Sequence, residues 1–514
     1  MNTPSTQNHS SASSAKKVGA ENNPPQAGQG AVPQSAEQSG AQTGAQSAAQ
    51  AAPAQSATAP AQDMTVAQST TSPAQSATQS AAQAAPAQGM AAAQSAAQAP
   101  QDVTASVNTN QQQVPPNPFV VPAPAVPTQE GPLGIRYDFN DGARVLLPKG
   151  KWHVQIEDDE TDNIIFACDA DEGWVLSTKK YYIPFRIRVW VRGEKEPVLN
   201  HTLDLTGKEV QIKFPVGTLG DIVGWLPYAD RFQQKHKCAA EITMAHNLAE
   251  VFEGQYPNLF FTHLPGKIRF EKPYASYMLG LFFKGNDTHQ PIDFRKVGLH
   301  RTAGYILGVD PREEAPKVKL GSPRKIKERY VCIATKSSSQ AKFWNNGYGW
   351  EQVVAYLKEL GYRVICIDKE PVTGFKYTWN RMPHEAEDFT GNKPLQERIA
   401  LLEHADFFIG LSSGLTWLAW CTHIPIVLIS GFTLPICEFY TPYRVFNSHG
   451  CNGCWDDINC NFDHYDYFWC PKFKNTDRQY ECTRLITGKQ VIGHIKQLMK
   501  DCHLTAPKNE SEEK

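Results

Sequence analysis

The chain has 514 residues, and its 50 basic and 52 acidic side chains leave a formal net charge of −2. This balance excludes a protein that binds nucleic acid through its overall charge, but not one with a local basic patch. The length exceeds that of a single domain. The composition divides it unevenly, because residues 1–118 contain no Phe, Tyr, Trp or Cys.

Residues 1–130 are rich in Ala, Gln, Ser and Pro, and the sequence QSAAQAAPAQ occurs in them twice. These repeats lack apolar faces that could stack as in a solenoid. The segment also cannot bury enough apolar surface to offset the entropy lost on ordering. We therefore predict a disordered tail.

The start of the sequence lacks the apolar stretch of a secretory signal, and the chain contains 12 Cys. Both features favour a cytoplasmic protein, in which clustered thiols bind metal or do redox chemistry more often than they form disulfides. The uncharged stretch 407–437 is interrupted by Gly and Pro. It therefore indicates a buried strand–helix–strand rather than a membrane span.

Residues 131–214 alternate between apolar and polar side chains, which predicts an antiparallel β-barrel or sandwich domain. In residues 185–192 the apolar side chains share one face, while three Arg and Trp190 share the other. That basic face indicates a solvated surface or a subunit contact. Asp169 and Asp171 match the metal-binding Asp-x-Asp of some sugar transferases, but acidic residues at this place predict a turn.

From residue 215 onward, helical and strand periodicities alternate, which implies parallel sheets. Helices are predicted at residues 221–237, 350–360, 395–404 and 415–421, and strands at 239–245, 330–335, 363–368, 407–410 and 424–430. The predicted fold class is α/β, with two Rossmann-like domains (215–312 and 328–447) that are joined by a linker (313–327) and face a cleft. A C-terminal helix and tail (485–514) end the chain.

The turn Gly217-Thr-Leu-Gly-Asp221 follows a predicted strand and opens a predicted helix. Asp221 is either an ordinary N-cap, which accepts hydrogen bonds from free backbone amides, or a base that faces the cleft. The glycine spacing does not match a dinucleotide-binding fingerprint.

Two later loops follow strands of the second domain, where doubly wound sheets bind ligands. The first carries Lys336 and Lys342 among hydroxyl side chains, and it is either an anion site or a polar capping loop. The second carries Ser412, Ser413 and Gly414, whose hydroxyls and amides suit phosphate oxygens, unless the loop is a plain Gly-rich connection.

The segment Gly410-Leu-Ser412-Ser-Gly414 also matches the nucleophile elbow of hydrolases. A hydrolase would need an acid and a His later in the chain. The nearest candidates, Asp456 and His464, lie in the cysteine-rich segment rather than on loops at the sheet edge. We therefore favour the phosphate-binding interpretation.

A cysteine-rich segment, residues 448–484, contains the strongest local signal. Its spacing predicts a finger with a four-thiolate metal site, although unrelated core cysteines are the alternative. Four thiolates leave no open position, so the metal would be structural, and the spacing does not separate zinc from iron. Cys460 is a spare ligand. The predicted ligands are Cys451, Cys454, Cys470 and Cys482.

Together these motifs resemble those of the ADP-heptose glycosyltransferases. In that family a Gly-x-x-Gly-Asp turn supplies the catalytic base, which matches Asp221, and a Lys before an aromatic pair holds the diphosphate, which matches Lys342. A late Gly-x-x-[Ser/Thr]-Gly-Leu loop surrounds the phosphates and matches residues 410–415.

Within that family the sequence resembles the bacterial autotransporter heptosyltransferases. The shared marks are K-F-W-N-N (342–346), G-L-S-S-G-L-T-W-L-A-W (410–420) and E-C-T-R-L-I-T (481–487). The lipopolysaccharide enzymes usually have Asp-Thr-Gly-Leu followed by a His, where this chain has Ser412, Ser413 and then Trp417.

The resemblance implies a GT-B type fold with an N-terminal β-barrel and a four-cysteine finger that binds one ferric iron per subunit, with zinc as the alternative. It implies inverting transfer of heptose from ADP-heptose to serine hydroxyls of autotransporter passenger repeats before export, by a dodecamer. Asp221 would be the catalytic base. Asp368, at a strand end, is a candidate for the ribose hydroxyls or a surface acid. The substrate-binding residues would be Thr218, Leu219, Lys342, Asp368, Arg398, Ser412, Ser413, Gly414 and Leu415.

Two other functions compete with this one. Transfer of heptose to lipopolysaccharide core would call for a basic, amphipathic surface on the first half. A non-catalytic assembly or adaptor protein would have no need of Asp221, Lys342 and Gly414 together. A zinc-finger nucleic-acid binder is rejected, because residues 451–470 contain four Asp and no Lys or Arg.

Overall fold

The computed structural model describes residues 117–215, 218–283 and 287–508, which fall within one compact unit of the chain. Most of the predicted tail lies outside these residues. Residues 117–130 are packed, however, since Val121 is buried and strand β1 (Gln129–Glu130) pairs with β2 (Arg136–Asn140). No helix in the described ranges is long and apolar enough to span a membrane.

The first half is built on an eight-stranded mixed sheet with the order β11-β10-β9-β12-β2-β3-β6, and β1 joins it at β2. Pairing is parallel from β11 to β2 and antiparallel from β2 to β6. Residues 210–214, predicted for the antiparallel domain, thus lie in the parallel part. The strands are Arg144–Leu147 (β3), Gly173–Leu176 (β6), Glu209–Lys213 (β9), Ala239–Ala245 (β10), Leu259–Leu264 (β11) and Ala275–Met278 (β12).

A four-stranded antiparallel sheet with the order β5-β4-β7-β8 accounts for the rest of the N-terminal region. Its strands are Trp152–Asp158 (β4), Ile164–Ala170 (β5), Phe185–Val191 (β7) and Leu199–Thr202 (β8). The apolar face of β7 is buried as predicted. Asp169 lies inside β5 rather than in a turn, because it pairs with His153 across the sheet.

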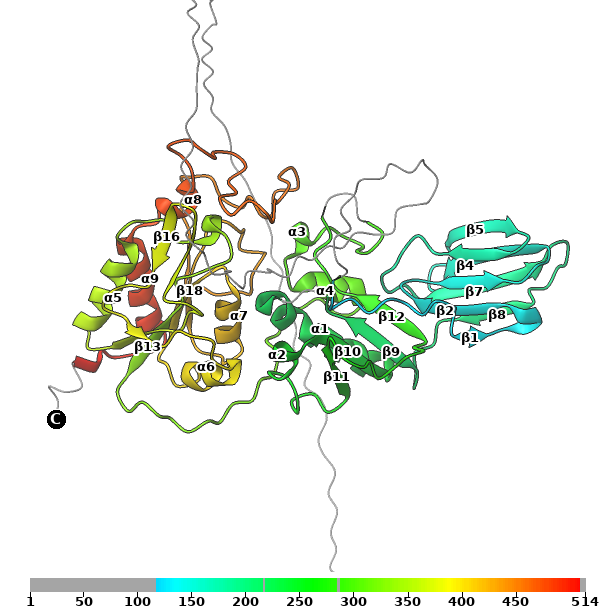
Figure 1. Cartoon of the computed structure of the whole chain (residues 1–514), viewed down its shortest axis with the longest axis horizontal. Helices are drawn as coiled ribbons and strands as arrows, with labels where there is room; N and C mark the ends of the chain where they lie inside the picture. The colour runs from blue at the N-terminus through cyan, green and yellow to red at the C-terminus, as the bar shows by residue number, and fades with distance from the viewer. Residues whose placement is uncertain (1–116, 216–217, 284–286, 509–514) are drawn as a thin grey trace, which may run out of the picture. The chain divides into compact units, whose positions relative to one another are not determined.

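The predicted N-terminal barrel is not confirmed, since the described strands form no closed barrel. Instead, β2, β3 and β6 extend the sheet of the first half (Figure 1). The physical reason is that alternation reports which side chains are buried, whereas strand partners are decided by tertiary packing.

The second half is a six-stranded parallel sheet with the order β17-β14-β13-β18-β19-β20. Helices α5 (Gly349–Glu359) and α9 (Gly488–Asp501) pack together on one face, and α6 (Leu395–Leu402) and α7 (Gly414–Trp420) cover the other (Figure 1). The strands are Tyr330–Ile333 (β13), Arg363–Cys366 (β14), Glu387–Asp388 (β17), Phe408–Leu411 (β18), Ile426–Ile429 (β19) and Arg444–Val445 (β20).

Helix α1 (Leu219–His236) connects the halves, because it packs on α4 (Arg301–Leu307) in the first half and on α7 in the second. Residues 310–328, which include the predicted linker, contain no helix or strand. Strands β15 (Val372–Phe375) and β16 (Thr378–Arg381) form a separate hairpin. The remaining short elements are α2 (His246–Ala249), α3 (Phe294–Val297), α8 (Glu481–Arg484), η1 (Pro132–Gly134) and η2 (Gln340–Lys342). The two halves agree with the predicted α/β fold class.

Candidate functional site

Helix α1 begins in the turn that carries the predicted base. Thr218 occupies the N-cap position with extended backbone, but its side chain makes no capping hydrogen bond. Leu219 is partly buried against the main hydrophobic cluster. Gly220 allows the second half to approach, since a Cβ there would lie 3.0 Å from Cδ1 of Trp417. Gly217 of the predicted motif lies outside the described residues.

Asp221 is the third residue of α1, so it is not an N-cap residue. Its residue surface is only 9% exposed. Burial raises the pKa of its carboxyl group to about 7, and the positive charge of Lys342 opposes that rise. A carboxylate of this basicity is suited to accept a proton from a hydroxyl group near neutral pH.

Lys342 ends the 3-10 turn η2, in the loop after β13. Its ammonium nitrogen lies 5.3 Å from the ring centre of Phe432 and 5.4 Å from that of Trp455. Burial lowers the pKa of this ammonium group, while the negative charge of Asp221 raises it. The structure thus brings together an acid and a cation that the sequence places in different halves.

Helix α7 starts against the start of α1. A Cβ on Gly414 would lie 2.9 Å from Cβ of Leu219 and 3.3 Å from the backbone nitrogen of Gly220, so a side chain here would push the helices apart. Ser413 is the N-cap residue, and within the described ranges its buried hydroxyl has no hydrogen-bond partner. Leu415 packs on the main hydrophobic cluster. The free hydroxyl and the first amides of α7 suit an anionic oxygen.

Ser412 belongs to a buried polar network. Its hydroxyl donates to Glu438, whose carboxylate also accepts from Thr433 and from Arg444, the latter at 2.7 Å. In the part of the chain that the structure describes, no His bonds to this hydroxyl; the ring of His464 packs against aromatic rings instead. The geometry therefore gives the hydrolase interpretation no support.

Asp368 and Arg398 hold loops rather than face open space. The Asp368 carboxylate accepts from the amide and hydroxyl of Thr335 at 2.9 and 2.8 Å and from the amide of Lys336 at 3.2 Å. The Arg398 guanidinium donates to four backbone carbonyls, those of Ile367, Asp368, Gly391 and Lys393. These contacts favour positioning roles over the predicted direct contacts with substrate, and Asp368 is no surface acid, since it is 1% exposed.

Lys336 is a further candidate in the loop that Asp368 holds. Its ammonium nitrogen is buried and has no hydrogen-bond partner among the described residues. Burial lowers the pKa of this group, and a bound anion would offset the cost of burying it. The sequence placed Lys336 in a hydroxyl-rich loop, but no local motif marked Glu438 and Arg444, which sequence reasoning missed.

The cysteines of the predicted finger lie near one another. The thiols of Cys451 and Cys482 share a hydrogen bond, which together with burial and the charges of Cys454 and Cys470 raises the pKa of Cys482. All 12 cysteines are free thiols. Within the described ranges, however, no three His, Cys, Asp or Glu side chains gather into an arrangement that could hold a metal. Four free thiols are the donors that a thiolate-bound metal requires, but in the described residues they are not arranged as a closed four-ligand site.

Two family models match the chain. One, described as the N-terminal domain of glycosyltransferase TibC, matches residues 131–193, and the other, glycosyltransferase family 9 (heptosyltransferase), matches residues 299–453. Autotransporter heptosyltransferase TibC from Escherichia coli O78:H11 is 60% identical over 382 residues, which cover 74% of this chain and 94% of TibC.

A crystal structure of TibC, described as an iron-containing dodecameric glycosyltransferase, has a TM-score of 0.73 and 59% identity, and it covers 74% of this chain and 100% of that chain. A second TibC structure is a complex with ADP-D-beta-D-heptose.

Two further relatives are described differently, one as a heptosyltransferase and one as an inactive heptosyltransferase. Autotransporter heptosyltransferase BAHTCr from Citrobacter rodentium is 60% identical over 380 residues, covering 74% of this chain and 93% of BAHTCr. BimC from Burkholderia thailandensis, described as an inactive autotransporter heptosyltransferase, is 40% identical over 380 residues, covering 73% and 89%. Activity must therefore be argued from the site.

Proposed function

This chain belongs to the autotransporter heptosyltransferases, and from that premise we propose that it moves heptose from ADP-heptose to serine hydroxyls of an autotransporter passenger domain. One observation carries the proposal. A buried carboxyl group with a pKa of about 7, Asp221, interacts with the ammonium group of Lys342 where the starts of α1 and α7 meet. A protein without catalytic activity has no need of this costly arrangement.

The proposed reaction is a single displacement. A serine oxygen bonds to the anomeric carbon while Asp221 takes the hydroxyl proton, and the bond to the diphosphate breaks with its electron pair leaving on ADP. One displacement inverts the anomeric centre and needs no covalent sugar–enzyme intermediate. Thr218 and Leu219 would contact the substrate at the start of α1.

The growing negative charge on ADP needs cations and hydrogen-bond donors near it. Lys342 and Lys336 supply charge, and Ser413 and the Gly414 amide supply donors. Leu415 would pack beside the donor sugar nucleotide, while Asp368, Arg398 and Ser412 hold the surrounding loops through the contacts described above.

We further propose that the four thiolates of Cys451, Cys454, Cys470 and Cys482 bind one ferric iron, because TibC is described as iron-containing. Zinc would suit the same donors. Four thiolates fill a tetrahedral site, so the metal would stabilise residues 448–484 rather than react. A dodecamer like that of TibC and a cytoplasmic location complete the proposal.

The proposal is tested by intact-mass analysis of a passenger domain co-expressed with this protein in cells that make ADP-heptose. We expect a ladder of masses spaced by whole heptose residues. ADP release without a ladder would point to a different acceptor. The absence of both would contradict the proposal and favour a non-catalytic protein, as BimC is described to be.

Replacing one finger cysteine tests the metal proposal. Cys454→Ser is expected to lose most of the bound iron, because a neutral hydroxyl is a poor ligand, and to lower the free energy of unfolding of the finger. Elemental analysis by mass spectrometry gives the metal content. Cys168→Ser, which alters a cysteine of β5 outside the finger, is the control, and equal metal in both variants would count against the proposal.

A further inference from the structure

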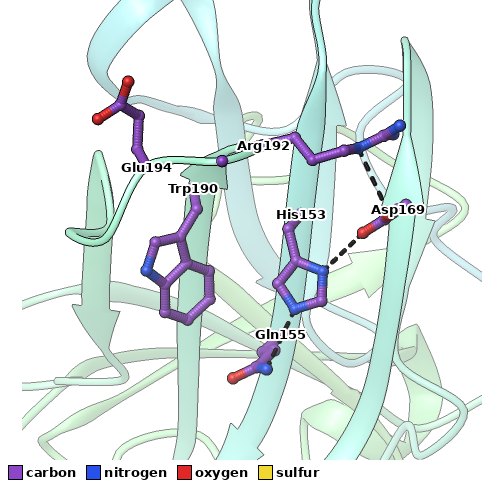
Figure 2. Close-up of a pocket in the computed structure, with 7 residues that line it drawn as sticks. His153, Gln155, Asp169, Trp190, Arg192 and Glu194 are labelled. Atoms are coloured by element: carbon purple, nitrogen blue, oxygen red, sulfur yellow. Dashed lines mark hydrogen bonds and ion pairs between the residues drawn. The ribbon is translucent and has the colours of Figure 1, made fainter.

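A pocket of about 270 Å³ opens on the polar face of the four-stranded sheet (Figure 2). None of its lining residues belongs to the site described above. The lining consists of His153 and Gln155 from β4, Asp169 from β5, Trp190 from β7, and Arg192, Gly193 and Glu194 from the loop after β7. Nearly all of this lining falls within residues 131–193, which the TibC N-terminal family model matches.

Strand register places three of these side chains in one row. Asp169 of β5 pairs with His153 of β4, which in turn pairs with Trp190 of β7. The rings of His153 and Trp190 lie 5.6 Å apart at an angle of 53°. The two rings stand side by side on the same face of the sheet (Figure 2).

Hydrogen bonds fix the polar groups of the pocket before any ligand arrives. Nδ1 of His153 lies 2.7 Å from Oδ1 of Asp169, and Nε2 of His153 lies 3.1 Å from Nε2 of Gln155. Nε of Arg192 lies 3.4 Å from the other Asp169 oxygen. The indole N–H of Trp190 donates to the carbonyl of Lys195 at 3.3 Å, which ties the ring to the following loop.

This combination suits a neutral sugar. Sugar hydroxyls donate hydrogen bonds to a carboxylate and accept them from amide and guanidinium groups, all of which the pocket holds in place. The C–H face of a sugar ring also packs on an aromatic ring. The lining contains one guanidinium, Arg192, and two carboxylates, Asp169 and Glu194, so the pocket has no excess positive charge. It is thus unsuited to the diphosphate of a sugar nucleotide or to nucleic acid.

We propose that this pocket is a non-catalytic binding site for a heptose that is already attached to the acceptor protein. The inference rests on the proposed function, because the heptosylated passenger is the product of that reaction. An acceptor held by one attached sugar presents its remaining serines at raised local concentration, so later additions become faster than the first. The strands of the pocket sheet lie between β3 and β9 in the sequence, so the pocket belongs to the half of the molecule that also carries Asp221.

Trp190→Ala tests the proposal, with Trp174→Ala as the matched control. Trp174 is a 45% exposed tryptophan of β6 and does not line the pocket. The probe is a passenger domain heptosylated by E. coli TibC, titrated by calorimetry beside the same unmodified passenger. We expect Trp190→Ala to weaken binding of the heptosylated passenger about tenfold. Trp174→Ala should bind the heptosylated passenger as tightly as the wild type does. Trp190→Ala should leave both the affinity for the unmodified passenger and the rate of the first heptose addition unchanged.

Asp169→Asn gives a second variant that keeps the shape of the row, and it is expected to weaken the same binding. Unchanged affinity in both variants, or an equal loss in Trp174→Ala, would overturn the proposal. A change of oligomer mass in Trp190→Ala would do so too, because the face would then be a subunit contact. Since TibC makes the probe, sugar binding without transfer would count against the proposed function, and transfer without sugar binding would count against the pocket.

Discussion

Replacing Asp221 with Asn is expected to lower kcat for heptose transfer by about 10²- to 10⁴-fold, the range typical for loss of a general base. Asn has nearly the same shape but cannot take the proton of the attacking serine. Asp221 is the third residue of α1, and Thr218 occupies the N-cap position. The measurement is the rate of ADP release in the presence of a passenger domain.

Asp230→Asn is the control for this variant. Asp230 lies on the same helix and accepts a hydrogen bond from Gln234 at 2.9 Å, outside the site. Its replacement should leave kcat unchanged. Full activity in Asp221→Asn would show that another group takes the proton.

The same substitution should remove a pH dependence. With a carboxyl pKa of about 7, wild-type activity should fall about tenfold per pH unit below that value and level off above it. Because the folded state holds this proton more tightly than the unfolded chain, the free energy of unfolding should decrease as pH rises from about 4 to about 7. Asp221→Asn should lack the change in activity and should show a smaller change in stability, because burial also raises the pKa of Asp456 to about 7 and that carboxyl group remains.

Replacing Lys342 with Met is expected to lower kcat by about 10²- to 10³-fold, because a positive charge near the departing diphosphate would be lost. A shift of the pH–activity profile would show that Lys342 also acts on the pKa of Asp221. The charge of Lys342 holds the pKa of Asp221 down, so its removal should move the acidic limb of the pH–activity profile to higher pH. The measurement is ADP release over a range of pH.

Lys358→Met is the matched control, since Lys358 lies on the exposed side of α5 and pairs with Glu385 at 3.1 Å. It should change neither the rate nor the profile. A rate loss in Lys342→Met with an unmoved acidic limb would mean that Lys342 acts only in binding the donor and does not influence the base.

Much of the second half could be predicted from the sequence, because its main helices and central strands have a clear period and a clear end. The hairpin of β15 and β16 and the short edge strands β17 and β20 were not predicted. Helix α5 was predicted one residue later than it occurs, and Gly361 after it adopts the positive φ of 91° that ends a helix. Strand β10 in the first half was predicted at its observed bounds. The predicted barrel is not confirmed in the described residues, because no local pattern says that β2 pairs with β12 rather than with a neighbour in sequence.

The candidate site likewise contains residues that the sequence marked and contacts that it did not reveal. Asp221 and Lys342 stand in recognisable motifs, and the structure brings them together. Substrate contact by Asp368 and Arg398 stays a prediction, and in the structure their partners are amides and carbonyls of nearby loops. Backbone partners leave no trace in the spacing of side chains, so sequence reasoning could not tell a positioning residue from a contacting one.

The parallel pairing of β12 with β2 has a consequence for the inheritance of this protein. Ala275 and Ser276 pair with Phe139 and Asn140, so strands from the N-terminal region complete the sheet of the first half. A crossover between residues 140 and 275 would pair β2 of one parent with β12 of the other, so that neighbouring side chains in the sheet come from different proteins and pack less well. Exchange with relatives should therefore be tolerated best at residues 310–328, where no strand is interrupted. The first half and the polar sheet face would then be inherited together, while the second half could be replaced.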